Sequence, residues 1–166
     1  WHLTITAGRD KSLRRELINL AHGAPAKADI LGWTDRIPEL LMTHHITISK
    51  AGGATTQESI NALCPLLVSQ IVPGQEEGNY ELIRRNDAGA LAETPAEIVT
   101  TLQRVFANNA ALWSHWRTNL RRLAQPNAAR TIATQVLGLP SASTSGSPLS
   151  CRTQQRGDSE LMSTIS

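Results

Sequence analysis

Short apolar runs alternate with helical patterns along most of the chain. Residues 3–7 alternate as a strand does, and leucines on one helical face follow them. Residues 28–32 and 45–49 are predicted as two further strands, each followed by a polar loop and a helical pattern. The near-continuous apolar run at 65–72 is typical of an interior strand of a parallel sheet. This order predicts an α/β fold with a Rossmann-like, doubly wound parallel sheet.

The later part of the chain is mostly helical in pattern. Thr94, with Glu97 three residues later, has the arrangement of a capping box and predicts that a helix begins there. Two more helical patterns follow. Beyond them the composition changes to serine, threonine, glycine and glutamine, with little to bury. We therefore expect one globular domain at 1–140 and a disordered tail at 141–166.

Charge and cysteine content narrow the class of partner. The 166 residues include 16 Lys and Arg against 14 Asp and Glu, so a net charge of +2 gives no field of the kind used to bind nucleic acid. Two cysteines, Cys64 and Cys151, form neither a disulfide framework nor a metal-ligand pattern. No apolar run reaches the roughly 18 residues of a membrane span, and the first residues show neither the basic region nor the apolar stretch of a signal peptide. We expect a cytoplasmic protein, at most peripheral on a membrane, that binds a phosphate-bearing small molecule.

A glycine-bearing loop follows the third predicted strand and opens a helix. Gly52 and Gly53 lack a Cβ, so their backbone N–H groups can approach a phosphate closely. Thr55 and Thr56 add hydroxyl groups at a helix N-terminus, where the macrodipole favours negative charge. Glu58, one turn further on, is placed to accept hydrogen bonds from hydroxyls such as those of a ribose. An isolated glycine pair is also compatible with a plain turn.

A second polar loop follows the fourth predicted strand. Gly74 and Gly78 enclose three long hydrogen-bonding side chains, and an asparagine opens the next helix. Carboxylate and amide groups of this kind bind polyols, so the loop is a candidate sugar site. The alternative is a solvated helix N-terminus, where acidic residues are favourable without any ligand. The candidate residues are Gln75, Glu76, Glu77 and Asn79.

The two loops together resemble the C-terminal donor domain of glycosyltransferase family 28. They look most like the diacylglycerol glucosyl- and galactosyltransferases, and more distantly like the peptidoglycan N-acetylglucosaminyltransferase. In that family, a GT-B fold binds the nucleotide sugar in its C-terminal half and the acceptor in its N-terminal half. The similarity covers about residues 3–107, and its motifs are Lys-Ala-Gly-Gly-Ala-Thr-Thr-Gln-Glu at 50–58, Cys-Pro at 64–65, Pro-Gly-Gln-Glu-Glu-Gly-Asn at 73–79, Gly-Trp-Thr-Asp-Arg at 32–36 and Thr-Ala-Gly-Arg-Asp at 6–10.

The resemblance implies a role for each matching position. Asp10 departs from the asparagine expected there, and an acid beside a diphosphate is a doubtful ligand. The acceptor domain is expected to be absent from this chain, so no catalytic base is assigned. The implied substrate-binding residues are Gly32, Trp33 and Thr34 near the uracil ring, Gly52, Gly53, Thr55 and Thr56 at the diphosphate, Glu58 at the ribose, Gln75, Glu76, Glu77 and Asn79 at the sugar, and Gly8 and Arg9 facing the interdomain cleft.

The implied activity is that of an inverting hexosyltransferase that moves a hexose from a UDP-sugar to a lipid-linked acceptor. It requires neither a metal nor another cofactor, and this chain would be an incomplete part of the enzyme. One alternative is a stand-alone donor-binding subunit that works with a separate acceptor-domain chain. Another is a fragment of a nucleotide-sugar epimerase, an enzyme class with the same architecture.

Two further features are interpreted as structural. His44 and His45 are adjacent, so in a strand they point to opposite faces and do not chelate one metal ion. Trp113 and Trp116 lie near arginines such as Arg117, which is compatible with a face that touches a membrane surface. Aromatic residues three apart on a helix are more often core residues, and we interpret the pair in that way.

Overall fold

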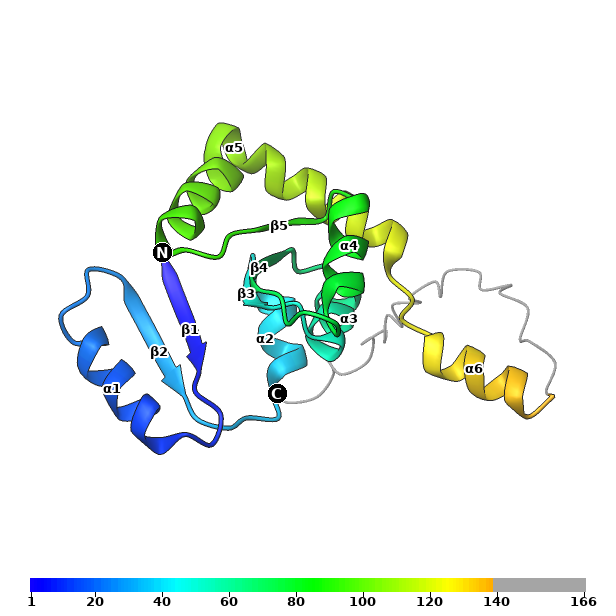
Figure 1. Ribbon diagram of the computed structural model, residues 1–166, viewed down its shortest axis with the longest axis horizontal. Coiled ribbons are helices and arrows are strands. Elements are labelled where there is room, and N and C mark those ends of the chain that lie inside the picture. The colour runs from blue at the N-terminus through cyan, green and yellow to red at the C-terminus, as the bar shows by residue number, and fades with distance from the viewer. Residues whose placement is uncertain (139–166) are drawn as a thin grey trace, which may run out of the picture. The chain divides into compact units, whose positions relative to one another are not determined.

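The computed structural model describes residues 1–138, so the tail predicted at 141–166 lies outside the described residues. Parallel strands alternate with helices (Figure 1). Trp1–Pro126 form one compact unit, and α6 belongs to a second. The strands are β1 (His2–Thr6), β2 (Lys27–Leu31), β3 (Thr47–Lys50), β4 (Leu66–Gln70) and β5 (Gly89–Leu91), and the helices are α1 (Lys11–Ala21), α2 (Ile37–Thr43), α3 (Gly53–Ala62), α4 (Glu77–Arg85), α5 (Pro95–Leu123) and α6 (Ala128–Val136).

The fold class predicted from the sequence is confirmed, and its strands are divided between two sheets. In one sheet β1 pairs with β2 in parallel, with Thr4 opposite Asp29. In the other, the order is β3-β4-β5 and both pairings are parallel. No ladder joins β1 to β3 within residues 1–138. The predicted strands are therefore present, but not as one continuous sheet.

The main core surrounds β4, as its apolar sequence predicts. Leu66, Leu67 and Val68 are fully buried, because β4 is the central strand of its sheet and helices cover its side chains. Ile60 of α3 and Ile83 of α4 complete the same cluster, together with a leucine of α5. By contrast, α1 contributes no buried residue. The part of the fold formed by β1, α1 and β2 therefore buries few side chains.

The predicted capping box at the start of α5 is confirmed. Thr94 Oγ1 accepts a hydrogen bond from the backbone N–H of Glu97, and the Glu97 carboxylate accepts one from the N–H of Thr94 at 3.0 Å. The helix is interrupted from Ala107 to Ala110, where Asn108 and Asn109 have positive φ. Asparagine tolerates this left-handed conformation better than most residues, so the two helical patterns of the sequence are joined through a kink.

The tryptophans of α5 serve packing, as the sequence interpretation expects. Trp116 is buried, and its Nε1 donates to the carboxylate of Asp87 at 3.2 Å. Trp113 donates to the backbone carbonyl of His45, and the guanidinium of Arg117 lies 5.0 Å from the centroid of the Trp113 ring. Both rings are therefore held by contacts within the fold.

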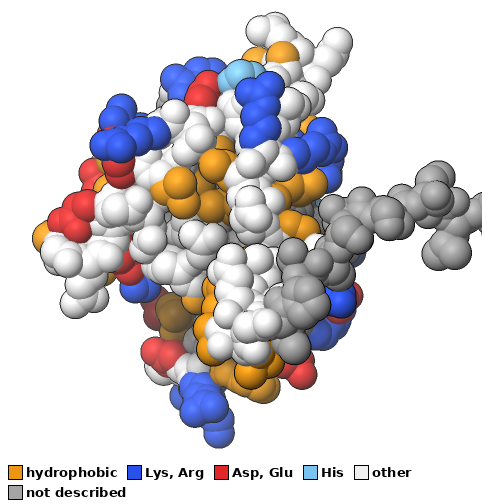
Figure 2. Space-filling view, turned by 90° about the vertical axis from the view of Figure 1, so that its right-hand side faces the viewer, with side chains coloured by type: hydrophobic (Ala, Val, Ile, Leu, Met, Phe, Trp, Pro, Cys, Tyr) orange, Lys and Arg blue, Asp and Glu red, His pale blue; other side chains and the backbone are white. Residues whose placement is uncertain are grey.

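Hydrophobic side chains also reach the surface. On the face drawn in Figure 2 they lie between lysine and arginine side chains. None of the described helices is both long enough and apolar enough to span a bilayer. The membrane contact raised by the sequence stays a prediction.

One cysteine lies at the junction of β3 and α5. Cys64 is buried, and its Sγ lies 3.3 Å from Oγ1 of Thr47 on β3. The backbone carbonyl of the preceding Leu63 accepts a hydrogen bond from Arg117 of α5. Burial raises the pKa of the Cys64 thiol, so it is neutral in the folded chain.

Candidate functional site

The two glycine loops lie side by side because β3 and β4 pair in parallel. Their carboxyl ends meet at the same edge of the sheet. Gly52 is the N-cap residue of α3, and no side chain caps this helix end in the described structure. The N–H groups of the first helical turn are thus available to an anion at this edge.

An ion pair joins the two loops. The Glu76 side chain is 6 % exposed, and its Oε1 lies 2.5 Å from Nζ of Lys50. Its second oxygen accepts a hydrogen bond from the backbone N–H of Val72 at 3.0 Å. The Lys50 hydrogen bond, followed by that of Val72, holds the pKa of Glu76 below its ordinary value. A Cβ on Gly52 would lie 3.7 Å from Oε1 of Glu76, so the two loops are in contact.

Asn79 makes a second link between the loops. Its side-chain amide donates to the backbone carbonyl of Ala51 at 2.9 Å. A Cβ on Gly53 would lie 3.7 Å from the same amide nitrogen, so the start of α3 lies in van der Waals reach of Asn79. The loop after β4 is therefore held against the helix start by an acid at one position and an amide at another.

The other two polar residues of the second loop differ in what they contact. Glu77 accepts a hydrogen bond from the backbone N–H of Gly74, which lowers the pKa of Glu77. Gly74 has φ of +79°, a conformation that favours glycine. Gln75 is exposed. The structure thus supports the local, helix-start interpretation for Glu77, and it presents Gln75 to solvent.

The two threonines of the first loop differ in how deeply they are buried. Thr55 is half-buried and Glu58 is exposed on α3, so both can meet a ligand from solvent. Thr56 is fully buried, and its hydroxyl has no hydrogen-bond partner among the described residues. Its burial does not favour the diphosphate contact predicted for it, whereas the corresponding expectation for Thr55 is compatible with the structure.

The loops after β1 and β2 form a second group. Gly8 has φ of +58°, and a Cβ on Gly32 would lie 3.6 Å from the Gly8 carbonyl oxygen. The Arg9 guanidinium stands 5.9 Å from the centroid of the Trp33 ring. Asp10 caps α1 by accepting from the N–H groups of Ser12 and Leu13, so its carboxylate already has partners in the helix that follows.

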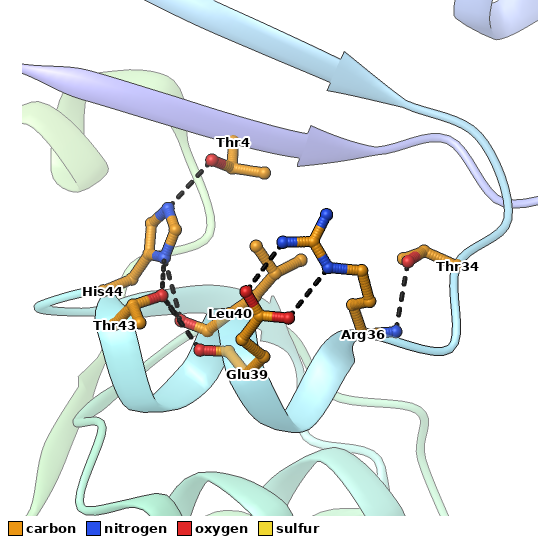
Figure 3. Close-up of polar contacts among 7 residues, drawn as sticks. All are labelled: Thr4, Thr34, Arg36, Glu39, Leu40, Thr43 and His44. Atoms are coloured by element: carbon orange, nitrogen blue, oxygen red, sulfur yellow. Dashed lines mark hydrogen bonds and ion pairs between the residues drawn. The ribbon is translucent and has the colours of Figure 1, made fainter.

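Thr34 completes this second group. Its hydroxyl accepts a hydrogen bond from the backbone N–H of Arg36 at 3.1 Å, which shapes the turn before α2 (Figure 3). The structure thus gathers the predicted residues at the carboxyl ends of the strands of both sheets. One group, from Gly8 to Thr34, lies at β1 and β2, and the other, from Gly52 to Asn79, lies at β3 and β4.

Sequence reasoning missed an open pocket of about 570 Å³. It is lined by residues of β1, α1, β2 and α2, and none of the predicted site residues takes part. Thr4 and His44 share a 2.8 Å hydrogen bond on its wall, and Arg36 pairs with Glu39 there (Figure 3). The Arg36 contact lowers the pKa of Glu39. No motif in the sequence could reveal this pocket, because its lining comes from separate elements.

Comparison with known proteins finds relatives that match most of this chain. The chain is 27% identical over 134 residues to monogalactosyldiacylglycerol synthase 2, chloroplastic, of Arabidopsis thaliana, covering 81% of this chain and 28% of that protein. It is 25% identical over 135 residues to the processive diacylglycerol beta-glucosyltransferase of Bacillus licheniformis, covering 81% of this chain and 35% of that protein. The resemblance inferred from the sequence is confirmed. No protein-family model matches the chain. The chain spans about a third of the length of these relatives.

A solved structure supports the fold. The glycotransferase of kitacinnamycin superposes with a TM-score of 0.55 at 19% identity, covering 84% of this chain and 36% of that one. At this identity the likeness concerns the fold alone. The GT-B expectation for the architecture is thereby confirmed, and the roles of individual residues stay predictions.

Proposed function

We propose that this chain is the donor-binding part of an inverting glycosyltransferase that moves a hexose from a UDP-sugar to a lipid-linked acceptor. The observation that carries the proposal is the contact between the two polar loops at one sheet edge. The uncapped start of α3 lies beside the loop whose acid and amide, Glu76 and Asn79, reach back to it. A phosphate and a polyol would be met there by adjacent groups.

The first loop supplies the diphosphate site. Backbone N–H groups at the start of α3 and the hydroxyl of Thr55 would donate hydrogen bonds to phosphate oxygens. When the glycosidic bond breaks, negative charge grows on the departing diphosphate. Donors fixed at the helix start stabilise that charge without having to reorganise. Lys50 adds a positive charge at the same edge, although in the structure it is paired with Glu76.

The nucleoside and the sugar would extend to either side of the diphosphate. Glu58, one turn into α3, accepts hydrogen bonds from ribose hydroxyls in this proposal, and Trp33 lies with the uracil ring near the turn after β2. Gln75 is the side chain best placed to meet the sugar, because it is exposed in the second loop.

The acceptor is proposed from the relatives. The two relatives named above carry diacylglycerol in their names, so we propose a lipid-linked hydroxyl as the acceptor and a peripheral association with a membrane. We propose no catalytic base among residues 1–138, because the role proposed for these residues is on the donor side of the reaction. The proposed mechanism of this part is binding of the donor and electrostatic stabilisation of its leaving group.

Isothermal titration of the purified chain tests the proposal. UDP, UDP-glucose, UDP-galactose, UDP-N-acetylglucosamine and ADP-glucose would be compared as ligands. Binding of one UDP-sugar in preference to ADP-glucose supports the proposal and identifies the hexose. Equal binding of the uridine and adenosine nucleotides, or binding that persists when Gly53 is replaced by valine, contradicts the assignment of this edge as the donor site.

A further inference from the structure

The ion pair between Lys50 and Glu76 lies beside the start of α3. A Cβ on Gly52, the N-cap residue, would stand 3.7 Å from Oε1 of Glu76 and 3.9 Å from Nζ of Lys50. The first turn of a helix favours negative charge, and the Glu76 carboxylate already brings one to this place. A second anion at the same helix start would therefore approach both members of the pair.

The two partners differ in how freely they can move. The side chain of Lys50 is 56% exposed, and its ammonium group ends a flexible four-carbon chain. Glu76 is 6% exposed, and the backbone N–H of Val72 also donates to its second oxygen at 3.0 Å. When the pair opens, Lys50 is therefore the partner that moves, while Glu76 stays in the second loop.

Opening the pair has a cost, which Glu76 sets. A buried carboxylate that loses its cation is left with a charge that nothing compensates. The hydrogen bond from Val72 remains, but it is only one of the two contacts that Glu76 makes. An anion that takes Lys50 has to offset this cost, so it binds more weakly than Lys50 and the helix start alone would allow.

We propose that the carboxylate of Glu76 competes with the phosphate groups of the donor for Lys50, so that the ion pair between the two loops opens when a diphosphate binds at the start of α3. Glu76 thereby weakens the binding of small anions such as inorganic pyrophosphate, which make no other contact. A nucleoside diphosphate sugar offsets the same cost through its base, ribose and hexose. The inference rests on the proposed donor site and adds a role for Glu76 within it.

Titration calorimetry with inorganic pyrophosphate tests the competition. Glu76→Gln keeps a side-chain oxygen that can accept the N–H of Val72, but it carries no charge to hold Lys50. We expect this variant to bind pyrophosphate about tenfold more tightly than the parent chain. Glu81→Gln is the matched control, because Glu81 is also an ion-paired acid of α4 but its partner is Arg84. It should leave the affinity for pyrophosphate unchanged, and circular dichroism verifies that each variant is folded.

A double-mutant cycle separates competition from simple repulsion. Lys50→Met removes the group for which Glu76 and the anion compete. In that background Glu76→Gln should change pyrophosphate affinity by less than about twofold. If Glu76 only repelled the anion, the gain would remain when Lys50 is absent. Should Lys50→Met fail to fold, the comparison of Glu76→Gln with Glu81→Gln decides the question without it.

The outcomes distinguish this inference from the proposed function. Weaker or unchanged binding of pyrophosphate to Glu76→Gln, an equal gain in Glu81→Gln, a gain that persists in Lys50→Met, or no pyrophosphate binding to any variant would overturn the competition. A chain that prefers a UDP-hexose to ADP-glucose but shows no gain in Glu76→Gln keeps the proposed donor and refutes the competition. A gain without any preference among nucleotides supports the competition and refutes the proposed donor.

Discussion

Lys50 and Glu76 join two loops that are 26 residues apart in the sequence, with Nζ and Oε1 2.5 Å from each other. Glu76 is the buried partner, and its second oxygen accepts the N–H of Val72. A carboxylate with these contacts holds the second loop in shape before any ligand arrives. We therefore regard Glu76 first as a residue that positions the loop, and Gln75 as the better candidate for direct contact with a sugar.

The first prediction concerns the pH dependence of stability. Because the pKa of Glu76 is lower in the folded chain than its ordinary value, the stabilisation from its ionised form is present at neutral pH. It is lost as the pH falls through the folded pKa. Glu76→Gln should therefore be less stable than the parent chain at about pH 7 and closer to it at about pH 3. Urea unfolding at a series of pH values measures this difference. Glu93→Gln, at an exposed position, is the control, and an equal pH slope for both variants would contradict the assignment.

The second prediction concerns the ribose. Glu58→Ala should weaken UDP binding roughly tenfold to a hundredfold, because hydroxyl groups of the ligand would lose their acceptor. Gln57→Ala is the matched control, since Gln57 is the preceding exposed residue on the same helix. Titration calorimetry of both variants measures the effect. If both bind UDP as the parent does, Glu58 is not in the site.

The third prediction separates the sugar from the nucleotide. Gln75→Ala should reduce affinity for the preferred UDP-hexose by about tenfold and leave affinity for UDP unchanged, because the side chain would contact only the sugar. Gln75 is exposed, so its replacement should not alter the fold. Competition between UDP and the UDP-hexose gives both affinities in one experiment. A parallel loss for the two ligands would show that Gln75 acts on the loop or on the phosphates.

The fourth prediction uses two glycines with opposite surroundings. A Cβ on Gly89 would stand 2.1 Å from the backbone oxygen of Leu66, so Gly89→Ala must push β5 away from β4. We expect it to destabilise the chain by about 1 to 3 kcal/mol. Gly78 of α4 has nothing within 4 Å of the same atom, and Gly78→Ala should raise stability by up to about 1 kcal/mol, because alanine favours a helix. Thermal unfolding of both variants measures the change in stability for each. A change in the same direction for both variants would contradict this prediction.

Much of the local structure could be predicted because single segments encode it. The apolar run that becomes β4 and the capping box of Thr94 and Glu97 each depend on neighbouring residues. The kink at Asn108 and Asn109 could also have been suspected, since adjacent asparagines tolerate positive φ. The division of the strands between two sheets could not be predicted from single segments. Strand pairing joins residues that are distant in the chain, and propensity says nothing about which edges meet.

The candidate site shows the same limit. The glycine loops and their polar residues were found from spacing and resemblance, and the structure brings Gly52 and Glu76 together as that interpretation requires. Which acid would face inward was not predictable, because Glu76 and Glu77 are adjacent and alike in sequence. Burial beside Lys50 distinguishes Glu76, and a local turn with Gly74 distinguishes Glu77. Thr55 and Thr56 are also adjacent and alike in sequence, and only their different burial in the fold distinguishes them.

The reactivity of the buried Cys64 thiol can report how often β3 moves. Its Sγ lies against Thr47 of that strand, and its raised pKa keeps it in the unreactive neutral form. A thiol reagent can therefore reach it only while β3 or α5 moves aside. In a chain with Cys151 replaced by serine, the labelling rate would measure how often that opening occurs. Any contact that restrains β3 would therefore be measured as slower labelling at a single sulfur atom.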